Sequence, residues 1–350
     1  MVCGRFAVLG RGIPRRPFKD KFDMRVLVTG GTGFTGSHLV RRLLARGDEV
    51  RVLDNQAGLF HDELKAQGAQ ITLGSVLDRD LCLSLTQGCE VVHHLAAAFR
   101  QVNRSQKEYW QVNVEGTRNI CQAALESGVR RLVYCSTQGV HGNVANPPGD
   151  EDTPIEPEDY YQYTKHQGEL AANEFLAKGL EVVTLRPMAI FGPGDPARFL
   201  MIYRRVKKGR FVMAGPGRAL YHPLYIDNLV DAFELAETAK GILGRAYLIG
   251  DAEFLTIKDL VLRIAKALDT QVKIIHIPFF PVYALSALCE LIFKPLPLEP
   301  PLFRRRADWF RQNRAFKIDR ARHDLGYEPK ISVDEGLRLT GRWYLEHGYI

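Results

Sequence analysis

One tyrosine and one lysine stand at a spacing that could move protons. Tyr161 and Lys165 are four residues apart, so on a helix of about 3.6 residues per turn they would share a face. A nearby ammonium group lowers the pKa of a phenol toward neutrality, which makes its hydroxyl a usable general acid and base. Tyr160 and Tyr163 are not candidates, because neither has a lysine four residues later.

A glycine-rich loop lies upstream of this pair. The segment 29–36 reads TGGTGFTG, directly after an apolar run and directly before a stretch of helical length. Gly30, Gly33 and Gly36 lack the Cβ atoms that would block a tight turn, a close approach to a pyrophosphate, and helix-on-strand packing. The free N–H groups at the start of the next helix attract a diphosphate. The loop therefore predicts a dinucleotide-binding site.

An acid closes the second apolar run. Asp54 lies 24 residues after Gly30, near the spacing of about 20 expected for the carboxylate that binds the adenosine ribose. A carboxylate there repels a 2′-phosphate, and alternation along a strand points Arg51 to the opposite face. The sequence therefore favours NAD over NADP. The alternative, NADP, would need a loop to supply a cation for its 2′-phosphate.

The elements that position these residues alternate along the chain from Arg25 onward. Short β-branched runs and amphipathic stretches of helical length follow one another, a pattern typical of βαβ units. We predict a doubly wound α/β fold with a parallel sheet. The expected strands are 26–28, 50–53, 70–73, 91–95, 131–135 and 181–185, and the expected helices are 36–46, 61–67, 81–87, 109–127 and 160–176.

Beyond Pro187 the pattern loosens, because proline and glycine recur. We interpret 24–186 as an NAD-binding domain and 187–350 as mainly a substrate-binding lobe, with some segments returning to the sheet. The expected helices of this part are 198–208, 227–238, 256–268 and 333–346.

Composition limits the partners and the compartment. The chain has 350 residues, 46% hydrophobic and 25% charged, as in an ordinary globular protein. Residues 1–23 hold +4 of the net charge of +7, so the remainder indicates no nucleic-acid partner. We interpret 1–23 as a poorly ordered extension, with a targeting arm as the alternative. Six cysteines without a CxxC pair favour a cytoplasmic location over a disulfide scaffold or a zinc module.

No stretch reaches the roughly 18 to 20 uninterrupted apolar residues that a transmembrane helix needs. The nearest candidate, 279–293, is interrupted by Pro281 and Glu290. Three interpretations of this stretch stay open, namely a buried helix, a lid over an apolar pocket, and a peripheral contact with a membrane surface.

Three polar groups have competing interpretations. The histidines show no paired metal-ligand spacing on a common helix, so we expect no metal site; they include His93, His94, His141 and His222. Asn113 is expected either to pin a helix or loop or to serve the cofactor or a proton relay. Arg304–Arg306 is interpreted as a solvated helix start, with a phosphate clamp as the alternative.

The combined motifs resemble the extended short-chain dehydrogenase/reductases, the NAD-dependent epimerase/dehydratase and 3β-hydroxysteroid dehydrogenase-like group. The resemblance runs from Met24 to near the C-terminus. Besides the glycine loop and the Tyr161/Lys165 pair, it rests on Asp54-Asn55, Gly74–Asp78, His94–Ala98, Asn113–Thr117, Cys135–Gly142, Leu185–Pro187, Tyr225–Asn228 and Asp324–Pro329. It implies an NAD-dependent enzyme that acts on a small molecule, and a homodimer.

The resemblance also implies the roles of single residues. Thr137 would orient the reacting oxygen, with Ser136 as the neighbouring alternative. Tyr161 would protonate or deprotonate the substrate oxygen, and Lys165 would bind the nicotinamide ribose. Ser75 stands where the family usually has aspartate, which weakens the expected adenine contact. The implied cofactor-binding residues are Gly30, Gly33, Phe34, Thr35, Gly36, Asp54, Asn55, Ser75, Val76, Leu95, Ala96, Ala97, Tyr161, Lys165 and Pro187.

Two positions bear on the substrate. Ala189 and Tyr221 replace the asparagine and the arginine with which nucleotide-sugar enzymes of this group hold a diphosphate, and alanine cannot donate that hydrogen bond. We therefore expect hydride transfer between nicotinamide and an apolar, hydroxysteroid-like secondary alcohol or ketone. The alternatives are a nucleotide-sugar 4-epimerase or dehydratase with tightly bound NAD, and a non-catalytic NAD-sensing protein. The implied substrate contacts are Gln138, Met188, Ala189 and Tyr221.

Overall fold

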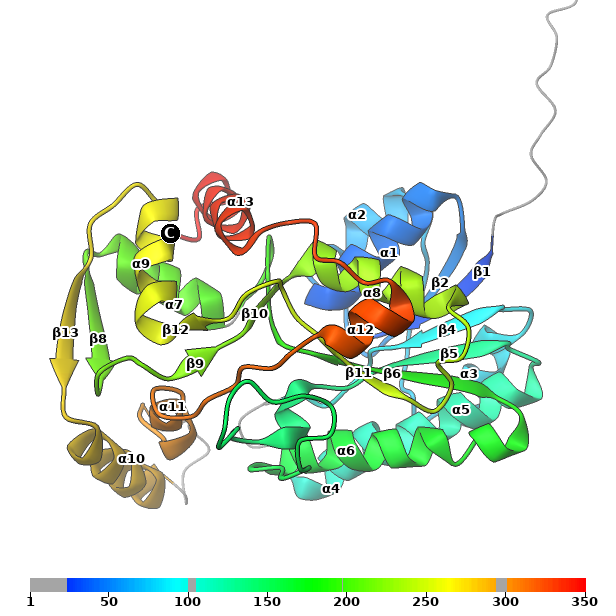
Figure 1. The fold of residues 1–350 in the computed structure, drawn as a ribbon. Coiled ribbons are helices and arrows are strands. Elements are labelled where there is room, and N and C mark those ends of the chain that lie inside the picture. The colour runs from blue at the N-terminus through cyan, green and yellow to red at the C-terminus, as the bar shows by residue number, and fades with distance from the viewer. Residues whose placement is uncertain (1–23, 100–104, 197, 294–300) are drawn as a thin grey trace, which may run out of the picture.

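A seven-stranded parallel sheet forms the centre of the computed structural model, which describes residues 24–99, 105–196, 198–293 and 301–350 (Figure 1). The predicted doubly wound α/β fold is confirmed, while the predicted extension 1–23 lies outside the described residues. The strand order is β11-β6-β5-β4-β1-β2-β3. The strands are β1 (Arg25–Thr29), β2 (Glu49–Asp54), β3 (Gln70–Leu73), β4 (Val91–His94), β5 (Arg131–Cys135), β6 (Glu181–Pro187) and β11 (Ala246–Ile249).

Helices cover both faces of the sheet because its strands are apolar on both sides. Val26 and Val28 of β1 pack into one core with α1 and α8, whereas Leu27 between them packs into another with α3 and α5. The first layer consists of α1 (Phe34–Arg46), α2 (His61–Ala66), α8 (Ile226–Thr238) and α12 (Asp319–Leu325). The second consists of α3 (Arg79–Thr86), α4 (Gln106–Trp110), α5 (Gly116–Glu126), α6 (Tyr160–Asn173) and the short 3₁₀ turn η3 (Leu176–Lys178).

The rest of the chain builds a lobe with its own aromatic-rich core. Its strands form two-stranded pairs outside the main sheet. Those strands are β7 (Ala189–Phe191), β8 (Arg210–Ala214), β9 (Leu220–Tyr221), β10 (Pro223–Tyr225), β12 (Leu255–Thr256) and β13 (Lys273–Ile277). The helices are α7 (Arg198–Lys207), α9 (Ile257–Ala267), α10 (Phe279–Phe293), α11 (Arg304–Asp308) and α13 (Val333–Glu346).

The helix predicted at 109–127 is interrupted. Between α4 and α5 the chain forms a π-helical turn, η1 (Gln111–Glu115). Wide turns of this kind are frequent at functional sites. The buried Asn113 lies in this turn, where its side chain bonds to other elements.

The interpretation of 279–293 as a buried helix is wrong. The stretch forms α10, but only Ser286 of its residues is buried. Within the described ranges no helix is both long and apolar enough to cross a bilayer.

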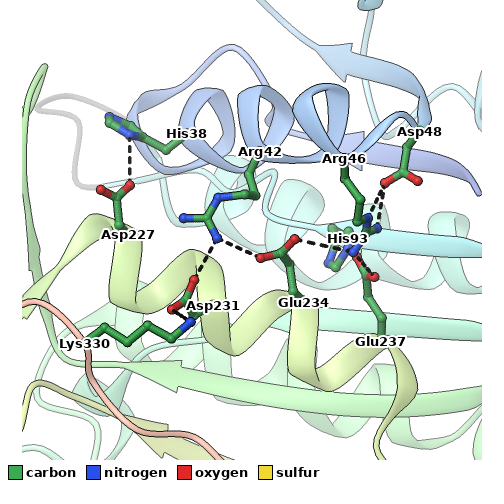
Figure 2. A network of polar contacts seen from close by, with 10 residues as sticks. All are labelled: His38, Arg42, Arg46, Asp48, His93, Asp227, Asp231, Glu234, Glu237 and Lys330. Atoms are coloured by element: carbon green, nitrogen blue, oxygen red, sulfur yellow. Dashed lines mark hydrogen bonds and ion pairs between the residues drawn. The ribbon is translucent and has the colours of Figure 1, made fainter. Parts of the chain in front are cut away.

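Two complementary charged stripes join α1 to α8 (Figure 2). Arg42 lies 2.7 Å from Asp231, and Arg46 lies 2.8 Å from Glu237. His93 of β4 extends the contacts into the sheet, since its Nε2 lies 2.8 Å from the buried Glu237 carboxylate. The bases recur every fourth residue of α1 and the acids every third or fourth residue of α8, at His38, Arg42 and Arg46 and at Asp227, Asp231, Glu234 and Glu237.

Candidate active site

The carboxyl ends of six parallel strands bring predicted site residues to one edge of the sheet. The glycine loop follows β1, Asp54 ends β2, Ser75 and Val76 follow β3, and other site residues lie at or after the ends of β4, β5 and β6. The strand order reverses between β1 and β4. Ligands of open α/β sheets bind outside the carboxyl ends at such a reversal.

The glycine loop has the shape of a phosphate cradle. A Cβ at Gly36 would come within 2.1 Å of the Gly30 carbonyl oxygen, so the loop and α1 could not keep their positions. Gly33 is exposed, and a Cβ there would meet only that same oxygen, at 3.3 Å. The space in front of Gly33 is therefore free of protein, as close approach of a pyrophosphate to the backbone requires. Phe34 and Thr35 begin α1 beside it and are half-buried.

Asp54 holds the loop while keeping acceptor capacity. Its carboxylate accepts hydrogen bonds from the Thr32 backbone at 2.9 Å, the Thr32 hydroxyl at 2.8 Å, and the Asn55 backbone at 2.8 Å. A carboxylate offers about four acceptor sites, which leaves one for a ribose hydroxyl. The Arg51 guanidinium donates to the carbonyls of Leu85 and Gln87 instead.

The remaining predicted cofactor residues flank this loop. Leu95, Ala96 and Ala97 are half-buried directly after β4, and the Ala96 N–H donates to the Thr29 hydroxyl at 3.2 Å. On the other side of β1, Ser75 is exposed and Val76 is buried. The Ser75 hydroxyl accepts a bond from the Leu77 N–H. Pro187 is buried at the end of β6.

The Tyr161/Lys165 pair lies in the first turns of α6. The helix begins at the cap Asp159, whose side chain accepts from the Gln162 N–H in a capping box. Tyr161 is half-buried and meets the exposed Phe99 edge-on, with ring centroids 5.2 Å apart. Lys165 is buried, and burial lowers its pKa to about 8. Its ammonium lies 4.2 Å above the centre of the Tyr134 ring, a cation–π contact.

The two hydroxyl candidates after β5 have different surroundings. The buried Ser136 donates its hydrogen bond to Glu169. The half-buried Thr137 precedes a short 3₁₀ turn, η2 (Gln138–His141), and its hydroxyl accepts from the Gly139 N–H at 3.0 Å. The Thr137 proton has no hydrogen-bond acceptor among the described residues, whereas that of Ser136 is used.

A buried polar network behind α6 was not predicted. Arg186 donates to both carboxylate oxygens of Glu169, at 3.0 and 2.6 Å, and to His141 Nε2 at 3.0 Å. Burial alone would raise the pKa of Glu169, but hydrogen bonds from His166, Arg186 and Ser136 outweigh it and hold this pKa at about 2. Burial lowers the pKa of His141 to about 4, so this ring is neutral. No local spacing in the sequence indicates this network, because Glu169 lies on α6 and Arg186 on β6.

Asn113 pins the loop after β4 to α6. Its amide oxygen accepts from the Ala98 N–H at 2.7 Å, and its amide nitrogen donates to the Thr164 hydroxyl at 2.9 Å. These are the contacts of a side chain that pins a loop, and they are made from the wide turn of η1.

The predicted substrate residues come from η2, from the end of β6 and from strands β7 and β9 of the lobe. Gln138 is half-buried, and its side-chain oxygen is buried with no hydrogen-bond partner among the described residues. Met188 is buried and Ala189 is half-buried at the start of β7. Tyr221 is buried and meets Trp309 edge-on, with ring centroids 5.7 Å apart.

Comparison with known proteins agrees with this geometry. Residues 26–250 match the model of the NAD dependent epimerase/dehydratase family. A 2-alkyl-3-oxoalkanoate reductase from Stenotrophomonas maltophilia is 34% identical over 90% of this chain and 98% of its own. A 3 beta-hydroxysteroid dehydrogenase/Delta 5-->4-isomerase from Mycobacterium tuberculosis is 33% identical over 92% of this chain and 90% of its own.

A solved structure extends the likeness to the fold. The dTDP-glucose 4,6-dehydratase DesIV from Streptomyces venezuelae, solved with NAD bound, has a TM-score of 0.73 and 26% identity. The match covers 92% of this chain and 97% of the other. With the glycine loop, the acid of β2 and the family match in agreement, the chain is an enzyme that belongs to the NAD-dependent epimerase/dehydratase family of extended short-chain dehydrogenase/reductases.

Proposed function

We propose that this enzyme transfers a hydride between a secondary alcohol or ketone of an apolar, hydroxysteroid-like substrate and NAD. The observation that carries the proposal is the pairing of the half-buried Tyr161 with the buried Lys165 at the carboxyl edge of the sheet. The two relatives named above are a reductase and a hydroxysteroid dehydrogenase. Both names describe chemistry at a carbonyl or hydroxyl carbon.

Each side chain then has a part in the reaction. Bound NAD supplies the carbon that gives or takes the hydride. Tyr161 takes the proton from the substrate hydroxyl when the alcohol is oxidised and returns it when the ketone is reduced. The Lys165 ammonium favours the phenolate form of Tyr161. Thr137 donates its free hydroxyl proton to the substrate oxygen and so orients it. A pKa of about 8 keeps Lys165 mostly protonated at neutral pH.

NAD fits the loop better than NADP. Asp54 would place a negative charge beside a 2′-phosphate. Arg51, the nearest cation on β2, is held by two carbonyls on the far side of the strand. We expect the affinity for NAD to exceed that for NADP, as a binding titration with each cofactor would measure.

An apolar substrate fits the residues that the lobe contributes to the candidate site. Tyr221 and Trp309 form an aromatic pair, and Ala189 provides a methyl group. Neither Ala189 nor Tyr221 supplies the amide or the cation that a diphosphate needs. The orphan oxygen of Gln138 can accept a hydrogen bond from a substrate hydroxyl.

The likeness to DesIV favours one second candidate, a nucleotide-sugar epimerase or dehydratase. The two candidates differ in the fate of the cofactor. A dehydrogenase forms NADH in proportion to product, whereas an epimerase ends its cycle with NAD restored. A screen of hydroxysteroids and UDP-sugars, read at the NADH absorbance, distinguishes them. UDP-sugar epimerisation without net NADH would refute the dehydrogenase proposal.

Tyr161→Phe tests the proposed acid/base. We expect kcat to fall by about 10²- to 10⁴-fold, the usual contribution of a positioned acid or base, while NAD affinity changes little. Tyr163→Phe is the matched control, because Tyr163 lies on the same helix and is 41% exposed. Equal activities of the two variants would contradict the assignment.

We also propose that two copies pair through α6 and its neighbours α4 and α5. Tyr163 and Leu170 are exposed, seven residues apart on α6, and so lie on one helix face. Molar mass in solution tests this, and Leu170→Glu should dissociate the pair.

A further inference from the structure

Helix α10 presents its apolar side to solvent. Among its exposed side chains, Phe280 is 81% and Leu291 is 69% exposed. At about 100° per residue the exposed positions fall on one stripe of the helix. They are Phe280, Pro281, Ala284, Leu285, Leu288, Leu291 and Ile292. A surface helix of a soluble protein normally has the opposite arrangement, with polar residues outward.

The only charged residue of α10 points the other way. Glu290 accepts hydrogen bonds from the Arg304 backbone and from its guanidinium, both at 2.7 Å. Arg311 lies 5.7 Å from the ring centre of Phe279 and 6.0 Å from that of Tyr283. The polar contacts of α10 are thus directed toward α11 and the segment that follows it, while the apolar stripe has no cover among the described residues.

Positive charge lies in the segment that packs against α10. Residues 279–293 and 301–311 contain four arginines and two acids, an excess of two positive charges; the arginines are Arg304, Arg305, Arg306 and Arg311, and the acids are Glu290 and Asp308. Arg304 and Arg311 have side chains 53% and 59% exposed, and they contact the side of α10 that faces away from the stripe. An apolar stripe on a region of net positive charge matches the interface of an anionic bilayer, in which acyl chains lie beneath negative headgroups.

We propose that α10 lies in the surface of an anionic lipid bilayer, parallel to it, and docks the enzyme there. Fifteen residues span about 22 Å as a helix, which is too short to cross about 30 Å of hydrocarbon. A second copy of the chain is a poorer occupant, because it would bring the same excess of positive charge to the contact. Docking would not depend on which reaction the site performs.

Helix α10 is connected to the candidate active site through α11. The Arg305 guanidinium lies 3.6 Å from the carboxylate of Asp159, the cap of the catalytic helix. One turn further on, Trp309 packs against Tyr221. A bilayer under α10 would therefore lie close to Tyr221 and Trp309, on the proposed substrate side of the site. An apolar substrate is concentrated in such a bilayer.

Flotation of the full-length protein with vesicles tests the proposal. We expect binding to phosphatidylcholine vesicles that contain phosphatidylserine, and weaker binding to phosphatidylcholine alone. Leu288→Glu combined with Leu291→Glu should lower the vesicle partition coefficient at least about tenfold, since two apolar side chains leave the lipid. Leu262→Glu combined with Leu345→Glu is the control, because these leucines are 42% and 43% exposed on other helices.

Three results would overturn the proposal. They are no flotation of the wild type with either vesicle, equal flotation of the Leu288/Leu291 variant, and a lipid-free dimer that this variant dissociates. The last result would assign the stripe to a second copy. An unchanged free energy of unfolding in urea, measured without vesicles, would show that the variant is folded.

Discussion

Glu169 is the residue on which the polar groups behind the catalytic helix depend. It neutralises Arg186 and accepts from Ser136. Glu169→Gln would leave the buried guanidinium without its counter-charge. Breaking one side of a buried ion pair costs about 3 to 5 kcal/mol, and we expect a loss of this size in the free energy of unfolding, measured by urea denaturation.

Glu174→Gln is the matched control for this change. Glu174 is also paired with an arginine, Arg118, but both side chains are exposed, and exposed pairs contribute only about 0 to 1 kcal/mol. Similar losses of unfolding free energy in the two variants would show that the buried Glu169 pair stabilises the fold no more than the exposed Glu174 pair.

At the scale of elements, two glycines of the same loop have different roles: Gly36 is needed for the loop to fold, and Gly33 is expected to be needed for NAD to bind. Gly36→Ala should unfold the loop and abolish NAD binding, because its Cβ would clash with the Gly30 carbonyl oxygen. Gly33→Ala should keep the free energy of unfolding within about 1 kcal/mol of the wild type. Its methyl group would enter the space for the pyrophosphate, so NAD affinity should fall at least about tenfold. Calorimetric titration measures it, and unchanged affinity would show that the pyrophosphate does not approach Gly33.

Local pattern predicted six strands of the sheet and four helices beyond residue 187, but neither the seventh strand β11 nor the strands of the lobe. The β-branched runs of β1, β2 and β5 are buried on both faces, so composition alone identifies them. Strands β8 and β13 pair across about 60 residues of chain, and no local signal specifies such a partner. The charged stripes of α1 and α8 are visible as spacings in the sequence, yet only the fold shows that they face each other.

The same limit applied to the site. The glycine loop, Asp54 and the Tyr161/Lys165 pair could be predicted as site residues because they stand at characteristic spacings along the chain. The link between Glu169 and Arg186 joins residues on a helix and a strand, so it required the packed structure. The wide turn at Asn113 depends on contacts with Ala98 and Thr164, which sequence periodicity cannot show.

For the whole molecule, buried histidines set the response to acid. Burial lowers the pKa of His94 to about 3 and the pKa values of His141 and His222 to about 4. The unfolded chain binds these protons from about pH 6.5 downward, before the folded chain does, so stability is lost as the pH falls from 6.5 toward 4. Asp251 acts in the opposite direction, because burial raises its pKa to about 7.

Three histidines outweigh one aspartate, so we expect the free energy of unfolding to fall as the pH drops from about 6.5 to about 4. His222→Gln should make this slope shallower by up to about 1.4 kcal/mol per pH unit, the value of one proton. His347→Gln, at an exposed ring, should leave the slope as it is. Urea titrations at several pH values measure both, and an unchanged slope in His222→Gln would exclude this histidine as a source of acid sensitivity.

The π-helical turn of η1 also fixes how α4 is rotated about its axis. A chain one residue shorter there would continue as a regular α-helix and turn α4 by about 100° relative to α5. Tyr109 and Trp110 now meet Tyr160 and Tyr163 of α6, and that rotation would point them elsewhere. A single-residue deletion in this turn would therefore misalign the aromatic surface against which α6 packs.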